Sequence, residues 1–106
     1  MKLNTSPYPV QLEVVHDWAI FSKKYKKAKG IEPEDGSKGI TSLLPDGSVL
    51  IYVQENDPIT LVHELNHFCI YTLEHIGLPI NDESSEAYCY YMDSLLNQFP
   101  QFRSAK

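Results

Sequence analysis

Two histidines and a glutamate in the run His63-Glu64-Leu65-Asn66-His67 constrain the fold of this chain more than any other feature. Side chains four residues apart on an α-helix point to the same side, so the two imidazoles can ligate one metal ion if the segment is helical. The carboxylate of Glu64 then lies close enough to such an ion to take a proton from water. The run therefore predicts a helix that carries a metal site, with Glu64 as a general base.

The flanking sequence supports a helix through this run. Asp57 suits the N-cap and Pro58 suits the first helical position. Gly77 favours a stop after about Ile76, before Pro79. Apolar residues lie almost all the way round the segment, which predicts a buried central helix. These residues are Ile59, Leu61, Val62, Leu65, Phe68, Ile70 and Leu73.

The N-terminal part predicts one strand and one helix. Residues 10–14 alternate apolar and polar side chains, as a half-buried strand does. Asp17 suits the N-cap of a helix that runs to about Lys29 and ends at Gly30. Its lysines form a basic stripe, which is more typical of a solvated helix face than of a surface that binds an acidic partner. They are Lys23, Lys24, Lys26, Lys27 and Lys29.

Two short apolar runs, residues 40–44 and 48–53, predict an antiparallel hairpin. The turn between them is Pro45-Asp46-Gly47, whose glycine can take the positive φ that a hairpin needs. With the helices, this hairpin predicts one α+β domain over residues 1–106. In it, a small and mostly antiparallel sheet packs against the helix that carries the two histidines and against the helix that follows.

That last helix, predicted from about residue 83 to residue 99, offers a third metal ligand. A catalytic zinc site needs three protein ligands and an open position for water. Glu86 begins a polar stripe that apolar residues border on both sides, which favours it as the ligand. Glu83, one turn earlier, is the competing candidate, and an acid in a first turn is also favoured by the helix dipole alone. The stripe consists of Glu86, Tyr90, Asp93 and Asn97.

Composition argues against several classes of partner. The net charge of −5 disfavours nucleic acid as the main partner. The longest apolar run, residues 49–53, is far too short to span a membrane, and the N-terminus lacks the apolar stretch of a secretory signal. Cys69 and Cys89 both lie in helical patterns, which predicts reduced core thiols and a cytoplasmic protein.

The histidine run, a glycine turn and then Glu86-Ala87-Tyr88 resemble the two-helix core of the gluzincins, zinc peptidases whose third ligand is a glutamate on the next helix. The chain more closely resembles a family of small phage- and prophage-encoded metallopeptidase-like proteins. The resemblance implies a minimal zincin-like fold with Zn²⁺ held by His63, His67 and Glu86. The segments that carry it are Tyr8-Pro9-Val10, Gly39-Ile40-Thr41, Val49 to Asp57, His63 to His67 and Asp82 to Tyr88.

The activity that these features imply is hydrolysis of a peptide bond in a peptide or protein substrate, with Glu64 as the base. The alternative is a phage-encoded, zinc-stabilised binding or inhibitory module that holds the metal without turnover. Both need the metal ligands, but only the enzyme needs Glu64. Because 106 residues leave little protein for a specificity cleft, a dedicated protein partner also stays open.

Two further features of a zincin site stay open in the sequence. One is the group that stabilises the oxyanion, for which the candidates are Tyr52, Tyr71, Tyr90 and His75. The other is the edge strand with which an extended substrate pairs in zincins. If residues 49–53 form that edge, Tyr52 or Gln54 faces the substrate.

Overall fold

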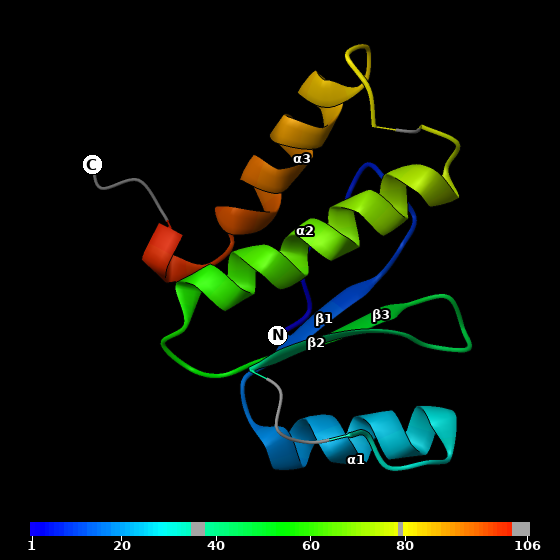
Figure 1. The fold of residues 1–106 in the computed structure, drawn as a ribbon, viewed down its shortest axis with the longest axis vertical. Coiled ribbons are helices and arrows are strands. Elements are labelled where there is room, and N and C mark those ends of the chain that lie inside the picture. Colours follow the sequence, from blue (N-terminus) through cyan, green and yellow to red (C-terminus); the bar gives the residue numbers. More distant parts are fainter. Residues whose placement is uncertain (35–37, 79, 103–106) are drawn as a thin grey trace.

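The computed structural model describes residues 1–34, 38–78 and 80–102, and these form three α-helices, a three-stranded sheet and a short 3-10 helix (Figure 1). The strands are β1 (Leu12–Val15), β2 (Gly39–Leu43) and β3 (Val49–Val53). The helices are α1 (Trp18–Lys29), α2 (Pro58–His75) and α3 (Ser85–Leu96), with the 3-10 helix at Pro100–Phe102. Within the described ranges, no helix combines the length and apolar character that crossing a membrane requires.

The sheet is mixed, with strand order β1-β3-β2. The predicted hairpin is confirmed, because β2 pairs antiparallel with β3. The prediction of a mostly antiparallel sheet is wrong, because β1 pairs with β3 in parallel. After β1 the chain passes through α1 and enters β2 in the direction opposite to β1. The hairpin turn then reverses the chain, so β3 runs parallel to β1.

β3 is the central strand, and all five of its side chains are buried. Val49, Ile51 and Val53 belong to a core cluster with α2, whereas Leu50 and Tyr52 pack with the side chains of α1. Figure 1 shows the same layering, with α1 on one face of the sheet and α2 on the other. An uninterrupted apolar run is what a strand covered on both faces requires.

α2 begins and ends where the sequence predicts. The Asp57 carboxylate accepts hydrogen bonds from the backbone N–H of Thr60 at 3.1 Å and from its hydroxyl at 2.7 Å. These two bonds lower the pKa of Asp57. At the other end, Gly77 takes a φ of +82°, a conformation that a glycine adopts without strain.

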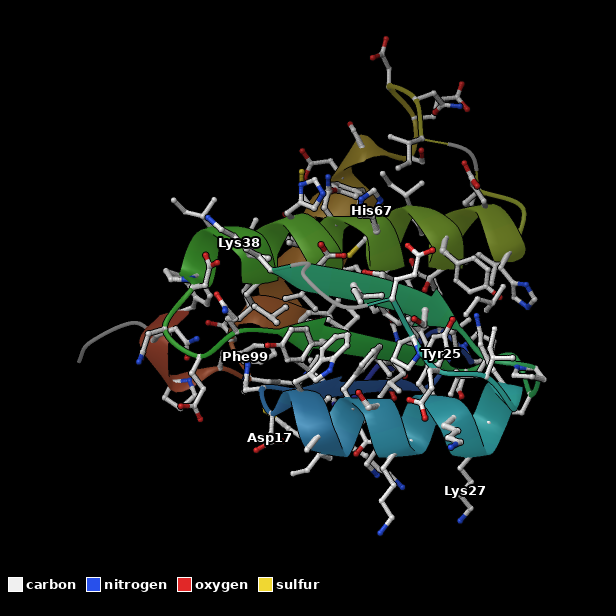
Figure 2. The ribbon with its side chains drawn as sticks, turned by 60° about the horizontal axis from the view of Figure 1, so that its bottom comes forward. Asp17, Tyr25, Lys27, Lys38, His67 and Phe99 are labelled. Atoms are coloured by element: carbon white, nitrogen blue, oxygen red, sulfur yellow. The ribbon has the colours of Figure 1, made fainter. Side chains whose placement is uncertain are left out.

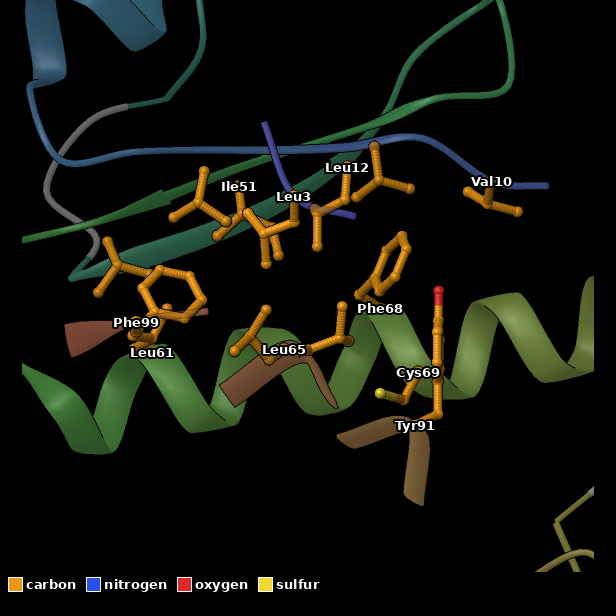
Figure 3. Close-up of a cluster of buried hydrophobic side chains, with 14 residues drawn as sticks. Leu3, Val10, Leu12, Ile51, Leu61, Leu65, Phe68, Cys69, Tyr91 and Phe99 are labelled. Atoms are coloured by element: carbon orange, nitrogen blue, oxygen red, sulfur yellow. The ribbon is translucent and has the colours of Figure 1, made fainter. Parts of the chain in front are cut away.

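One side of α2 faces the sheet and the other is open. Leu61, Leu65 and Phe68 point from α2 towards the strands (Figure 3), and burying each such side chain contributes about 1.5–3 kcal/mol. The prediction that α2 is buried nearly all round is wrong on the opposite side, where Ile59 is 83% exposed and Val62 is 36% exposed. The helix therefore presents part of the histidine run to solvent.

α3 packs on α2 through Tyr91 and Leu95, which are both buried. The Tyr91 hydroxyl donates a hydrogen bond to the Thr5 carbonyl at 3.0 Å, which ties α3 to the N-terminal segment. The helix is shorter than the predicted range of 83–99. Before it, the Asn81 side chain accepts the backbone N–H groups of Glu83 and Ser84, so a turn takes up the first residues of that range.

The lysines of α1 and the two cysteines test two further predictions. All five lysines are exposed, and Figure 2 shows Lys27 pointing away from the sheet, as a solvated helix face requires.

Both cysteines are free. Cys69 is a core thiol whose burial raises its pKa to about 12. The prediction is wrong for Cys89, which is exposed.

Candidate metal centre

The two histidines of the run lie one turn apart on the exposed side of α2, and their Nε2 atoms are 3.2 Å apart. Two ligand nitrogens, each about 2.0–2.1 Å from a tetrahedral zinc ion, are about 3.3 Å apart. The spacing of His63 and His67 therefore suits two ligands of one ion. Figure 2 shows His67 on the α2 side of the sheet, away from α1.

Glu64 points in a different direction, towards the sheet, and is only 7% exposed. The Thr41 hydroxyl on β2 donates a hydrogen bond to Glu64 Oε1 at 2.7 Å. The same hydroxyl lies 3.3 Å from the backbone carbonyl of Glu64. A carboxylate acceptor makes such a bond stronger than one between neutral groups, so the first contact fixes one carboxylate oxygen.

Gly39, two residues before Thr41, leaves room for the Glu64 side chain. A Cβ atom at this position would lie 2.9 Å from Glu64 Cγ, 3.0 Å from Glu64 Oε2 and 2.6 Å from Thr60 Cγ2. Contacts this short require the neighbouring atoms to move. The close approach of β2 to α2 therefore depends on the absence of a side chain at Gly39.

An open pocket of about 490 Å³ lies between β2 and α2 and brings Glu64 and one histidine to a common surface. Glu64 and His67 line it on the α2 side. Beyond them it continues over apolar side chains towards Tyr71, one turn after His67. Its lining is completed by Gly39, Ile40, Thr41, Leu43 and Val49. A molecule bound in this pocket would contact Glu64 directly.

The third ligand is not assembled in this structure. Glu86 is exposed in the first turn of α3, and Glu83 is exposed in the turn before it. Among residues 1–34, 38–78 and 80–102, no three His, Cys, Asp or Glu side chains are grouped closely enough to hold a metal ion. The residues present thus fit two positions of a zinc site, and the structure does not bring Glu86 or Glu83 to the third.

The four candidates for oxyanion stabilisation lie in different places. Tyr52 is buried on the α1 side of the sheet, where its ring centroid is 5.1 Å from that of Trp18, so the sheet separates it from the histidines. Tyr90 is 69% exposed on α3. Tyr71 lines the pocket with Glu64, and His75 stacks on it at 5.7 Å. Tyr71 is therefore the candidate that the fold brings to the pocket.

The edge of the sheet beside α2 is β2, not β3. Because β3 is central, the condition under which Tyr52 or Gln54 would face a substrate is not met. Just beyond the two ends of β2, hydrogen bonds join Leu44 to Ser48 and Lys38 to Gln54. Because hydrogen-bonded pairs alternate along an antiparallel ladder, the even-numbered residues of β2 bond to β3. In an antiparallel ladder the intervening residues point outward. The N–H and C=O groups of residues 39, 41 and 43 therefore lie on the free edge.

Thr41 and Gly39 were not recognised as site residues from the sequence. They occur there only as part of a short strand match, Gly39-Ile40-Thr41. The available signal was their spacing, since residues i and i+2 of a strand share one face. A glycine and a hydroxyl residue on the face that meets α2 would have indicated a close approach and a hydrogen bond.

Comparison of the chain with protein-family models, curated proteins and solved structures finds no match. The geometry of His63, His67 and Glu64 is therefore the basis for any assignment of function.

Proposed function

We propose that this protein is a zinc-dependent metallopeptidase of the minimal, gluzincin-like type that its sequence resembles. The observation that carries the proposal is the 3.2 Å separation of the His63 and His67 Nε2 atoms, beside a glutamate that a hydrogen bond holds at the pocket. The spacing suits one zinc ion. A pair of histidines that only held a metal would not need Glu64 at the pocket wall.

Each residue has a chemical role in this proposal. His63 and His67 hold zinc, which would supply the positive charge that polarises a peptide carbonyl and makes water acidic near neutral pH. Glu64 takes a proton from the attacking water and delivers it to the leaving amine nitrogen. Glu86 is the proposed third ligand, which requires the first turn of α3 to come closer to the histidines than it lies here.

The free edge of β2 supports a peptide as the substrate. Its outward N–H and C=O groups can pair with an extended chain, as in β-strand addition. Such a chain would lie along the pocket that Glu64 and His67 line. Side chains of the bound peptide opposite Thr41 and Leu43 would point to the α2 side of the sheet, because paired residues share a face.

Zinc content and the chemistry of Glu64 test the proposal together. We expect purified protein to bind about one zinc ion per chain and to cleave unstructured peptides from a random library. Glu64→Gln should retain the zinc and lose at least about 100-fold of the cleavage rate, because an amide cannot accept the proton. Metal content is measured by mass spectrometry of the elements, and cleavage by sequencing the peptide products.

Two controls sharpen this experiment. His63→Ala should lose both zinc and cleavage, whereas His16→Ala, a histidine that hydrogen-bonds to the Val53 carbonyl, should lose neither. Folded protein that binds no zinc would rule out the proposal. Zinc binding with a biological effect that Glu64→Gln retains would instead favour the non-catalytic binding module.

A further inference from the structure

We propose that Thr41 is a positioning residue for Glu64. Its hydroxyl fixes one oxygen of the carboxylate and leaves the other beside Gly39, at the pocket. This inference rests on the proposed function, because the orientation of the carboxylate matters to catalysis only if Glu64 is a base.

The hydrogen bond distinguishes the two carboxylate oxygens. Oε1 accepts the Thr41 hydroxyl at 2.7 Å. Oε2 is the oxygen that would lie 3.0 Å from a Cβ atom at Gly39. The hydrogen bond from Thr41 therefore already occupies Oε1. The oxygen beside Gly39 is therefore the one that remains to accept a proton.

The two residues restrict the side chain in complementary ways. A glutamate side chain has three torsion angles and samples many rotamers when nothing restrains it. Thr41 selects a rotamer by hydrogen bonding, and Gly39 permits that rotamer by leaving its space empty. Because Thr41 and Gly39 lie on the same face of β2, one strand supplies both restraints on the Glu64 side chain.

Thr41 can also be explained as a purely structural residue that satisfies a partly buried carboxylate. The two roles differ in what happens when only the hydroxyl is removed. Thr41→Val keeps the shape and suits a strand. Thr41→Ser keeps the hydroxyl and loses a methyl group. A structural role predicts changes in stability alone, whereas a positioning role predicts a change in the orientation of Glu64.

The first test uses the metal-free protein. NMR couplings of ¹³C-labelled Glu64, assigned with Glu64→Gln, report whether its side chain occupies one rotamer. We expect one rotamer in the wild type and in Thr41→Ser, and averaging in Thr41→Val. Ser42→Ala is the matched control, because Ser42 carries a buried hydroxyl on the same strand but on the other face. A single rotamer in Thr41→Val would overturn the proposal.

The second test measures cleavage of the random peptide library by the zinc-loaded variants. Thr41→Val should bind zinc as the wild type does and cleave about 10-fold more slowly, the loss expected for one charge-assisted hydrogen bond. Thr41→Ser should recover most of that rate, and a Thr41→Val rate equal to that of the wild type would overturn the proposal. The wild type could also cleave nothing while the Glu64 side chain of Thr41→Val samples several rotamers by NMR. That result would contradict the peptidase function and still support the effect of the hydrogen bond on the orientation of Glu64.

Discussion

At the scale of single residues, the contact between β2 and α2 shows where sequence reasoning reaches its limit. The two histidines and Glu64 could be recognised from their spacing, because a helix fixes how residues three and four apart are placed. Thr41 lies 23 residues from Glu64 in the sequence. Nothing in local periodicity relates two residues at that separation, so their hydrogen bond required the packed structure.

Gly39→Ala should destabilise the fold. The added methyl group meets Thr60 Cγ2 at 2.6 Å and Glu64 Cγ at 2.9 Å, and overpacking of this kind costs about 1–3 kcal/mol. Urea unfolding measures the loss. Gly47→Ala is the control, because its Cβ meets nothing and only the φ of +88° is strained. If Gly39→Ala were as stable as the wild type, the contact between β2 and α2 would be looser than the structure describes.

The two thiols should react at very different rates. Cys69 is buried, and its pKa of about 12 leaves almost no thiolate at pH 8. Cys89 is exposed on α3. Under native conditions, a disulfide reagent such as Ellman's should label one thiol per chain, and Cys89→Ser should abolish that fast reaction. Cys69 should react only as the protein unfolds. Fast labelling of both thiols would contradict the packing of α2 on α3.

At the scale of whole elements, the position of α3 decides whether the metal site can be completed. The sequence predicts that this helix exists, because its apolar residues follow a helical period. Its position on α2 depends on the contacts of Tyr91 and Leu95. Those are tertiary features, and for this reason the sequence could name Glu86 as a ligand but could not place it.

Separate substitutions of the two acids at the start of α3 identify the third ligand. Glu86→Ala should weaken zinc binding by at least about 10-fold, whereas Glu83→Ala should leave it unchanged. Isothermal titration with zinc measures both affinities. The reverse ranking would make Glu83 the ligand. If both variants bound zinc with the affinity of the wild type, neither acid would contact the metal.

Proline substitutions test the free edge of β2. Leu43→Pro removes an N–H that points away from β3, and prolines are tolerated on edge strands in that orientation. Ser42→Pro removes an N–H that bonds to β3 and should unfold the hairpin. We expect Leu43→Pro to remain folded by circular dichroism. It should cleave library peptides several-fold more slowly, because one hydrogen bond to the bound peptide is lost. Unchanged cleavage would place the substrate elsewhere.

At the scale of the whole molecule, the candidate metal centre lies outside the hydrophobic core. The two core clusters lie on opposite faces of the sheet and are built from aliphatic and aromatic side chains. The histidines are exposed and belong to neither cluster. We therefore expect the fold not to depend on a metal, in contrast to small domains that a structural zinc ion holds together.

Chelation should accordingly leave the protein folded. We expect the far-ultraviolet circular dichroism to be the same with and without a chelator. Zinc at about 100 times its Kd should add about 2.7 kcal/mol of stability and raise the Tm by about 10 °C. His63→Ala should keep the metal-free Tm and lose the rise. Unfolding on chelation would mean that the metal has a structural role.

The architecture was predictable in its parts and less so in its assembly. Capping residues and periodicity indicated the helices and the hairpin, because those signals act within a few residues. The parallel pairing of β1 with β3 and the edge position of β2 depend on how the chain returns after α1. Strand order depends on contacts between segments that are far apart in the sequence, and short local patterns do not predict it.

The alternation of side chains along β2 limits how the hairpin can change. A slip of one residue against β3 would turn Thr41 and Gly39 to the α1 face and bring Ile40 under Glu64. The turn at residues 45–47 is exposed, where single insertions are usually harmless. Here an insertion that was absorbed as a slip would keep a folded sheet and move Thr41 away from Glu64, so under the proposed function the length of the hairpin would affect catalysis.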